Sequence, residues 1–100
     1  MSSKFKVSID KELEEIVPGF LEKRRLELPI LLQKLKESDF DTLKSSGHKI
    51  KGNSGGYGFD GLGKLGARLE VLSAEKKSQE IQQVLTEMQN YLDSVEIEYV

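Results

Sequence analysis

The sequence predicts an all-α protein, an antiparallel up-and-down four-helix bundle with a short extra helix near its N-terminus. Four long segments repeat apolar residues at spacings of three and four, as amphipathic helices do. Short stretches with capping or helix-breaking residues separate these segments. The chain has 100 residues, enough for one hydrophobic core. We therefore expect a single domain over residues 1–100, and we assign no strand because the β-prone C-terminal end has no evident partner.

The first two predicted helices lie on either side of Pro18. Asp10 is the expected N-cap of the short extra helix, residues 11–17, which ends near that proline. A longer helix is expected over residues 19–36. Its apolar stripe consists of Leu21, Leu28, Leu31, Leu32 and Leu35. Pro29 removes a backbone donor within this helix, so we expect a kink or a break there.

The next helix carries the only histidine of the chain, His48. Ser38 or Asp39 can cap its N-terminus. Its inner stripe is Phe40, Leu43, Gly47, Ile50, Ser54 and Tyr57. His48 lies about 130° from the centre of this stripe at 100° per residue, so it should point outward. The glycine-rich run at 55–58 is expected to end the helix with one left-handed glycine.

Two further helices complete the bundle. One begins near Phe59 or Asp60, and the last covers residues 78–95. Their inner stripes are Leu62, Leu65, Leu69 and Leu72 in the first, and Ile81, Val84 or Leu85, Met88, Leu92 and Val95 in the second. Residues 96–100 alternate charged and apolar side chains, and we expect them to fray or to lie along the bundle.

Charge is unevenly distributed along the chain. The net charge is −2, which argues against a nucleic-acid-binding protein. Between Thr42 and Leu69, however, the only anion is Asp60, against five cations: Lys44, Lys49, Lys51, Lys64 and Arg68. This basic excess around His48 favours an anionic group or an acidic partner. The chain has no cysteine, no apolar run that could span a membrane and no apolar leader, so we expect a cytoplasmic protein without membrane contact.

Several other functions fit the sequence poorly. Residues 61–66 match G-x-G-x-x-G, but no strand precedes them, so dinucleotide binding is not indicated. Residues 47–54 resemble a phosphate-binding loop in which Asn53 replaces the required lysine. A hydrolytic triad lacks an oxyanion hole, and a metal site lacks ligands beside His48. An ordinary surface histidine is the plainest alternative.

Glycines around His48 argue for more than an ordinary histidine. Each glycine within a helix costs about 0.5–1 kcal/mol relative to alanine, so a helix with several of them needs a reason. Gly47, on the inner stripe, would let a neighbouring helix approach closely. Gly52 and Gly55 leave space around His48 for a phosphoryl group and for a partner. Lys44 and Lys51, at i−4 and i+3, share the side of His48 and could contact phosphate oxygens.

The motif His48-x-x-Lys51-Gly52-x-Ser54-x-x-x-Gly58, followed by Leu69-Glu70, resembles the histidine-containing phosphotransfer (HPt) domains of two-component phosphorelays. The resemblance implies a four-helix bundle with an exposed phosphoaccepting His48. It also implies that Lys51 contacts the phosphoryl oxygens, that Gly52 gives access, and that Ser54 and Gly58 stay small for helix packing. The motif departs from the family pattern at Asn53 and in the extra Gly55-Gly56 pair.

The resemblance further implies how the protein acts. His48 would accept a phosphoryl group from a receiver-domain aspartate and pass it on, without kinase activity of its own. The expected partners are response-regulator receiver domains and a hybrid sensor histidine kinase. The chain itself needs no cofactor, since Mg²⁺ would be on the receiver, and we expect a monomer. The alternatives are a non-catalytic helical interaction module that uses the basic face around His48 and, more distantly, a small histidine-dependent enzyme.

Overall fold

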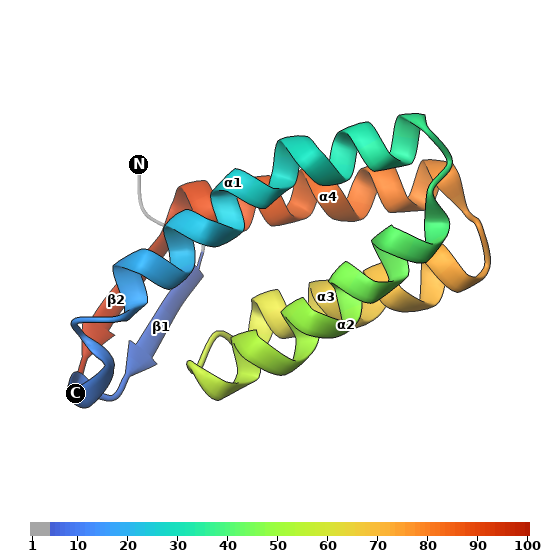
Figure 1. The fold of residues 1–100 in the computed structure, drawn as a ribbon. Helices are drawn as coiled ribbons and strands as arrows, with labels where there is room; N and C mark the ends of the chain where they lie inside the picture. Colours follow the sequence, from blue (N-terminus) through green and yellow to red (C-terminus); the bar gives the residue numbers. More distant parts are fainter. Residues whose placement is uncertain (1–4) are drawn as a thin grey trace.

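A computed structural model of the protein describes residues 5–100 and contains four long helices and two short strands (Figure 1). In chain order these are β1 (Phe5–Ile9), α1 (Val17–Lys36), α2 (Phe40–Gly56), α3 (Asp60–Ala74), α4 (Ser78–Ser94) and β2 (Val95–Tyr99). Each helix contacts two others, in the order α1, α2, α3, α4 and back to α1. The predicted four helices are confirmed, and no helix in this part of the chain combines the length and apolar character needed to cross a membrane.

The three connections between helices share one geometry. The last turns of α1, α2 and α3 are followed by Ser38, Gly58 and Lys76, which have left-handed φ values of 55°, 89° and 59°. The N–H of the next residue then bonds back to a carbonyl in the last turn, as in a Schellman motif. These bonds run from Asp39 to Lys34, from Phe59 to Ser54 and from Lys77 to Leu72, at 2.9, 2.8 and 3.0 Å. Gly58 is thus the left-handed glycine expected in the run at 55–58.

Asp39 caps the N-terminus of α2. It is one of the two residues, Ser38 and Asp39, that the sequence predicts as possible caps. Its Oδ1 accepts from the Thr42 backbone N–H at 3.1 Å, and its Oδ2 accepts from the Thr42 hydroxyl at 2.7 Å. These hydrogen bonds, together with Lys34 nearby, lower the pKa of Asp39, against a smaller opposing effect of desolvation. The charged carboxylate therefore fixes the start of the helix that carries His48.

The core fills the space between the helices and extends to both strands. Its largest fully buried side chains include Phe59, Ile9, Leu43, Leu62, Leu69, Ile81 and Met88. Two aromatic contacts link α1 to the connection after α2: the Phe20 ring lies 4.5 Å from the Tyr57 ring and 5.6 Å from the Phe59 ring, centre to centre. Burial of these large apolar side chains is the main stabilising contribution to the bundle.

The structure corrects the prediction for the N-terminal segment. The extra helix over residues 11–17 is not formed; a single 3₁₀ turn, Lys11–Leu13, takes its place, and Asp10 caps it by accepting from the Glu12 N–H at 2.9 Å. Pro18 does not end a helix but lies in the first turn of α1, where its missing N–H costs nothing. Of the kink or break expected at Pro29, the break is not formed, because α1 continues through this exposed proline, and the kink stays a prediction.

The second correction concerns the C-terminal residues. Instead of fraying, Val95–Tyr99 forms β2, whose partner is β1, a segment not predicted as a strand. The two strands run parallel, with Phe5 opposite Val95 and Ile9 opposite Tyr99, and they lie at one end of the bundle (Figure 1). Both strands alternate partly buried or buried apolar residues with exposed polar ones, which is the pattern of a sheet with one face on a core.

Candidate functional site

The site is built on a close contact between the backbones of α2 and α3. A Cβ atom on Gly47 would lie 2.6 Å from the Glu70 backbone nitrogen and 2.8 Å from the Gly66 carbonyl oxygen. A Cβ atom on Gly66 would lie 2.6 Å from the Lys51 backbone nitrogen. Real side chains do not tolerate such distances, so only glycine at both positions permits this packing. The close helix approach predicted for Gly47 is confirmed.

This contact places Glu70 of α3 beside His48 of α2. His48 follows Gly47 by one residue, and Glu70 follows Gly66 by one helical turn. The His48 Nδ1 atom lies 3.1 Å from Glu70 Oε2, within hydrogen-bond distance. The imidazole is 71% exposed, as its outward position on the helix predicts, whereas the Glu70 side chain is only 25% exposed. The ring therefore stands in solvent with one nitrogen occupied by a carboxylate.

The position of Glu70 beside His48 is the feature of the site that the sequence analysis does not predict. The motif included Glu70 only as part of Leu69-Glu70 and assigned it no role. A signal was nevertheless present, because Gly47 and Gly66 both lie on inner faces of their helices. Had the two glycines been paired across the interface, Glu70 would have been placed next to His48.

Lysines border the site on the outer face of α2. Lys44 and Lys51 are exposed, and neither forms an ion pair with any residue that the structure describes. Lys51 also lines a shallow groove of about 400 Å³ between α2 and α3, together with Gly55, Asp60, Gly63, Lys64 and Ala67. Arg68, by contrast, pairs with Glu87 of α4 at 3.0 Å. The basic excess seen in the sequence is thus carried on this face mainly by lysines that can still bind an anion.

The small residues of the motif fall into two groups. Gly52 and Gly55 are exposed, and a Cβ atom on either would meet nothing within 4 Å. Ser54 is fully buried at the α2–α3 interface, and Gly58 holds the left-handed turn after α2. The first pair keeps the surface beside His48 free of side chains. The second pair serves packing and chain direction.

The arrangement determines which imidazole nitrogen can react. When Nδ1 carries the proton, it donates to the Glu70 carboxylate, and Nε2 then keeps its lone pair. A carboxylate on one nitrogen fixes the tautomer and ring orientation and stabilises positive charge on the ring. In this tautomer Nε2 is the nitrogen with a free lone pair, on a ring that is 71% exposed.

Fold and site together define a four-helix-bundle module that carries an exposed, hydrogen-bonded histidine. Residues 4–98 match the family model described as the Hpt domain, and the chain belongs to this family. Hpt domains are phosphocarrier modules of two-component phosphorelays rather than kinases, and they interact with receiver domains and kinases. No curated protein and no solved structure matches the chain.

Proposed function

We propose that His48 accepts a phosphoryl group on Nε2 from an aspartyl phosphate of a receiver domain and passes it to a second receiver. The observation that carries this proposal is the contact between His48 Nδ1 and Glu70 Oε2 at 3.1 Å on a ring that is 71% exposed. It leaves the other ring nitrogen accessible and without a partner among residues 5–100. Exposure suits a transfer reaction in which two proteins must bring their reacting atoms together.

The chemistry follows from this geometry. The Nε2 lone pair forms a bond to phosphorus while the bond from phosphorus to the aspartate oxygen breaks, which returns the aspartate as a carboxylate. The imidazole keeps its Nδ1 proton, so the phosphorylated ring bears a positive charge. Glu70, hydrogen-bonded to that proton, offsets this charge. The reverse sequence on a second receiver regenerates neutral His48.

Lys51 and Lys44 are proposed to contact the phosphoryl oxygens. Both lie on the same side of α2 as His48, at i+3 and i−4, and both are exposed without an ion-pair partner in the described part of the chain. Charge neutralisation of this kind is a main requirement of phosphoryl transfer. Gly52 and Gly55 are proposed to give the partner's backbone access to the ring.

The remaining features of the proposal concern the partner and the assembly. We expect the acidic pocket and Mg²⁺ to be supplied by the receiver. The chain path in Figure 1 and the short connections support an antiparallel, up-and-down order of the helices. The monomeric state, the cytoplasmic location, the single domain over residues 1–100 and a hybrid sensor kinase as partner stay predictions.

The test uses receiver domains that have been phosphorylated with a small phosphodonor. The domain is incubated with each of them, and label on the domain is examined for stability in acid and in base. We expect label that is acid-labile and base-stable, as a phosphoramidate bond is, on the wild type and none on His48→Gln. Both proteins should have the same circular dichroism spectrum, because His48 contributes nothing to the core.

Two outcomes contradict the proposal. Label that persists on His48→Gln places the acceptor elsewhere. No label from any receiver, although the receivers themselves are phosphorylated, leaves the chain as a binding module in which His48 has no chemical role.

A further inference from the structure

A second polar site lies between α1 and α2, on the side of α2 away from Glu70. It is a hollow of about 300 Å³ lined by Gly19, Phe20, Lys23, Arg24, Asn53 and Tyr57. Its charged residues come from α1, and its amide and phenol come from the end of α2 and the residue that follows it. Neither the motif around His48 nor the proposed transfer chemistry uses any of these side chains.

Arg24 is the unusual member of this group, since it is a charged side chain that is 95% buried, with 5% exposed. The guanidinium carbon lies 5.3 Å from the centre of the Phe20 ring, a cation–π distance that holds the group in place. Its Nε lies 2.8 Å from Glu27 Oε1, an ion pair without hydrogen-bond alignment. The two terminal amino groups have no acceptor among the described residues. Solvent reaches these two groups, because Nε is the Arg24 nitrogen that is both buried and without a hydrogen bond. Accessible arginine donors that lack an acceptor indicate a place for an anion.

The other lining residues favour the same chemistry. Lys23 is exposed and forms no ion pair in the described part of the chain. Asn53 and Tyr57 can each donate a further hydrogen bond. Lys23 and Arg24 together with Glu27 give the hollow a net charge of about +1. This charge matches a monoanionic carboxylate better than a dianionic phosphate.

The hollow is within reach of a protein that covers His48. Asn53 follows His48 by five residues, which corresponds to about 7.5 Å along the axis of α2. Between the two, Gly52 is exposed, and a Cβ atom there would meet nothing within 4 Å. A docked surface can therefore extend from His48 to the hollow past Gly52, with the exposed Lys49 at its edge.

We propose that this hollow receives a carboxylate side chain of the protein that docks over His48, and that Lys23 and Arg24 hold it. The inference rests on the proposed phosphotransfer function. A bidentate arginine–carboxylate contact at a second point would fix the rotation of the partner about His48. Fixed orientation supports both transfer, which needs aligned atoms, and choice among similar partners.

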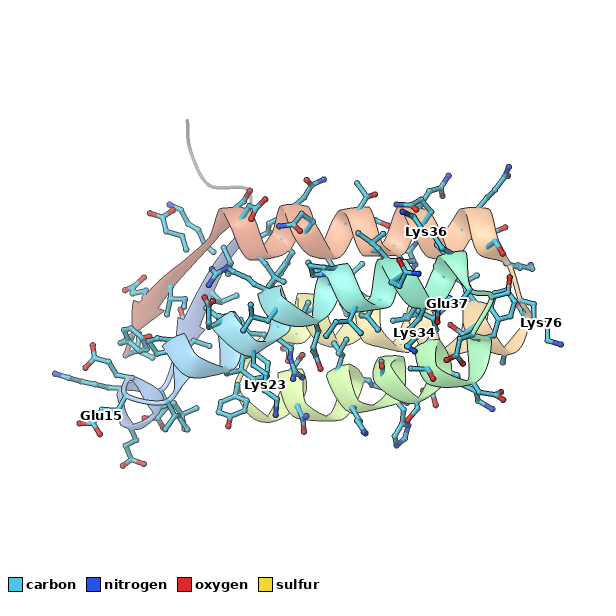
Figure 2. All side chains as sticks on the ribbon, turned by 45° about the horizontal axis from the view of Figure 1, so that its top comes forward. Glu15, Lys23, Lys34, Lys36, Glu37 and Lys76 are labelled. Carbon is cyan, nitrogen blue, oxygen red and sulfur yellow. The ribbon has the colours of Figure 1, made fainter. Side chains whose placement is uncertain are left out.

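The first experiment compares charge reversals at two exposed lysines of α1, Lys23→Glu and Lys36→Glu. Figure 2 shows these residues towards opposite ends of the helix. For a receiver that labels wild-type His48, we expect Lys23→Glu to raise the apparent Kd about five- to tenfold and Lys36→Glu to leave it within about twofold. Arg24→Lys keeps the positive charge but loses the planar guanidinium that can bind a carboxylate through two hydrogen bonds. This variant should weaken receiver binding as well. Labelling of His48 by phosphoramidate, which needs no docking, should be equal in all variants.

The second experiment tests the hollow without a receiver. The wild type is titrated with sodium acetate against sodium chloride at equal ionic strength, and the NMR signals of the Arg24 Nε–H and the Asn53 side-chain amide are followed. We expect saturable shifts with acetate that are absent in Lys23→Glu. This readout does not depend on how Arg24→Lys folds.

The outcomes separate the two proposals. Equal effects of Lys23→Glu and Lys36→Glu on receiver binding, or no effect of either, overturn the inference while the labelling of His48 stands. The absence of a saturable NMR shift with acetate also overturns the inference. If acetate binds but Lys23→Glu leaves the affinity for the receiver unchanged, the hollow is only a small-anion site, and the inference is again overturned. If no receiver labels wild-type His48, the proposed function itself is wrong, and the inference is wrong as well because it rests on that function.

Discussion

Gly47 and Gly66 each occupy the space that a side chain on the other would need. A Cβ atom on Gly47 would lie 2.8 Å from the Gly66 carbonyl oxygen, and one on Gly66 would lie 2.9 Å from the Gly47 carbonyl oxygen. The two helices therefore meet backbone to backbone at this point. The distance between His48 and Glu70 depends directly on this contact, since each residue follows closely after one of the two glycines.

Alanine at position 47 should separate α2 from α3. The gain in helix propensity, up to about 1 kcal/mol, is smaller than the cost of overpacking, about 1–3 kcal/mol, so Gly47→Ala should lower the free energy of unfolding. Gly52→Ala is the matched control, because its added methyl group meets nothing within 4 Å. Urea unfolding of both variants checks this. Gly47→Ala as stable as Gly52→Ala would show that the helices do not pack as described.

Loss of the Glu70 carboxylate should slow phosphorylation of His48. Glu70→Ala removes the acceptor of the Nδ1 proton, so we expect labelling by phosphoramidate to fall about ten- to a hundredfold, as when other orienting partners are removed. Glu70→Gln keeps an acceptor oxygen without the charge and should retain more activity. Nitrogen-15 NMR of labelled wild type should place the phosphoryl group on Nε2. A phosphoryl group on Nδ1 would contradict the assigned hydrogen bond.

Lys51→Ala should weaken phosphoryl transfer without unfolding the protein. Lys51 is exposed and unpaired in the described part of the chain, so its removal leaves the core unchanged. We expect labelling of His48 to fall about tenfold, the loss of one charge-assisted contact to the phosphoryl oxygens. Lys49→Ala, a change of the same charge on a different side of α2, serves as the control. An unfolded Lys51→Ala protein would contradict the position of Lys51 on the outer face.

Glycine at position 76 should stabilise the connection between α3 and α4. Lys76 has φ = 59°, a left-handed conformation that costs an L-residue about 1–2 kcal/mol. Lys76→Gly should therefore be more stable than Lys76→Ala by about 1 kcal/mol, because both variants lose the same charge and only alanine keeps the Cβ atom. Thermal unfolding of the pair measures the difference. Equal melting temperatures would argue against the left-handed turn.

Acid should remove the contribution of Asp39 to stability. Its pKa is lowered in the folded state by hydrogen bonds from Thr42, so its contribution is present above the ordinary pKa of 3.8 and is lost as the pH falls through the folded value. Asp39→Asn keeps a cap but no charge. We expect it to melt below the wild type near pH 7, with the difference closing as the pH falls below 3.8. A difference that stays constant with pH would mean that the charge plays no part.

Much of the helical structure could be predicted because it depends on local patterns. The outward position of His48 follows from the spacing of Leu43, Gly47 and Ile50, and the cap at Asp39 follows from residue type. The helix does not break at Pro29, because a proline on an exposed helix face costs stability without stopping the helix when packing holds the turns on either side.

Contacts between distant segments could not be read in this way. The sequence alone does not predict a strand over the C-terminal residues, because a strand needs a partner. That partner, β1, lies about ninety positions away in the sequence. Both segments alternate apolar and polar residues over five positions, a signal that becomes informative only when the two are compared. The contact of Glu70 with His48 was missed for the same reason, since it depends on how two helices cross.

The pairing of β1 with β2 has a consequence for the order in which the protein folds. Phe5 and Val95 are ninety positions apart in the sequence, whereas the helices meet their neighbours through connections of a few residues. Closing so long a loop is entropically costly until the helices have already brought its ends together. We therefore expect the bundle to assemble first and the strands to join last. During synthesis, β1 therefore has no partner strand until residues 95–99 have left the ribosome.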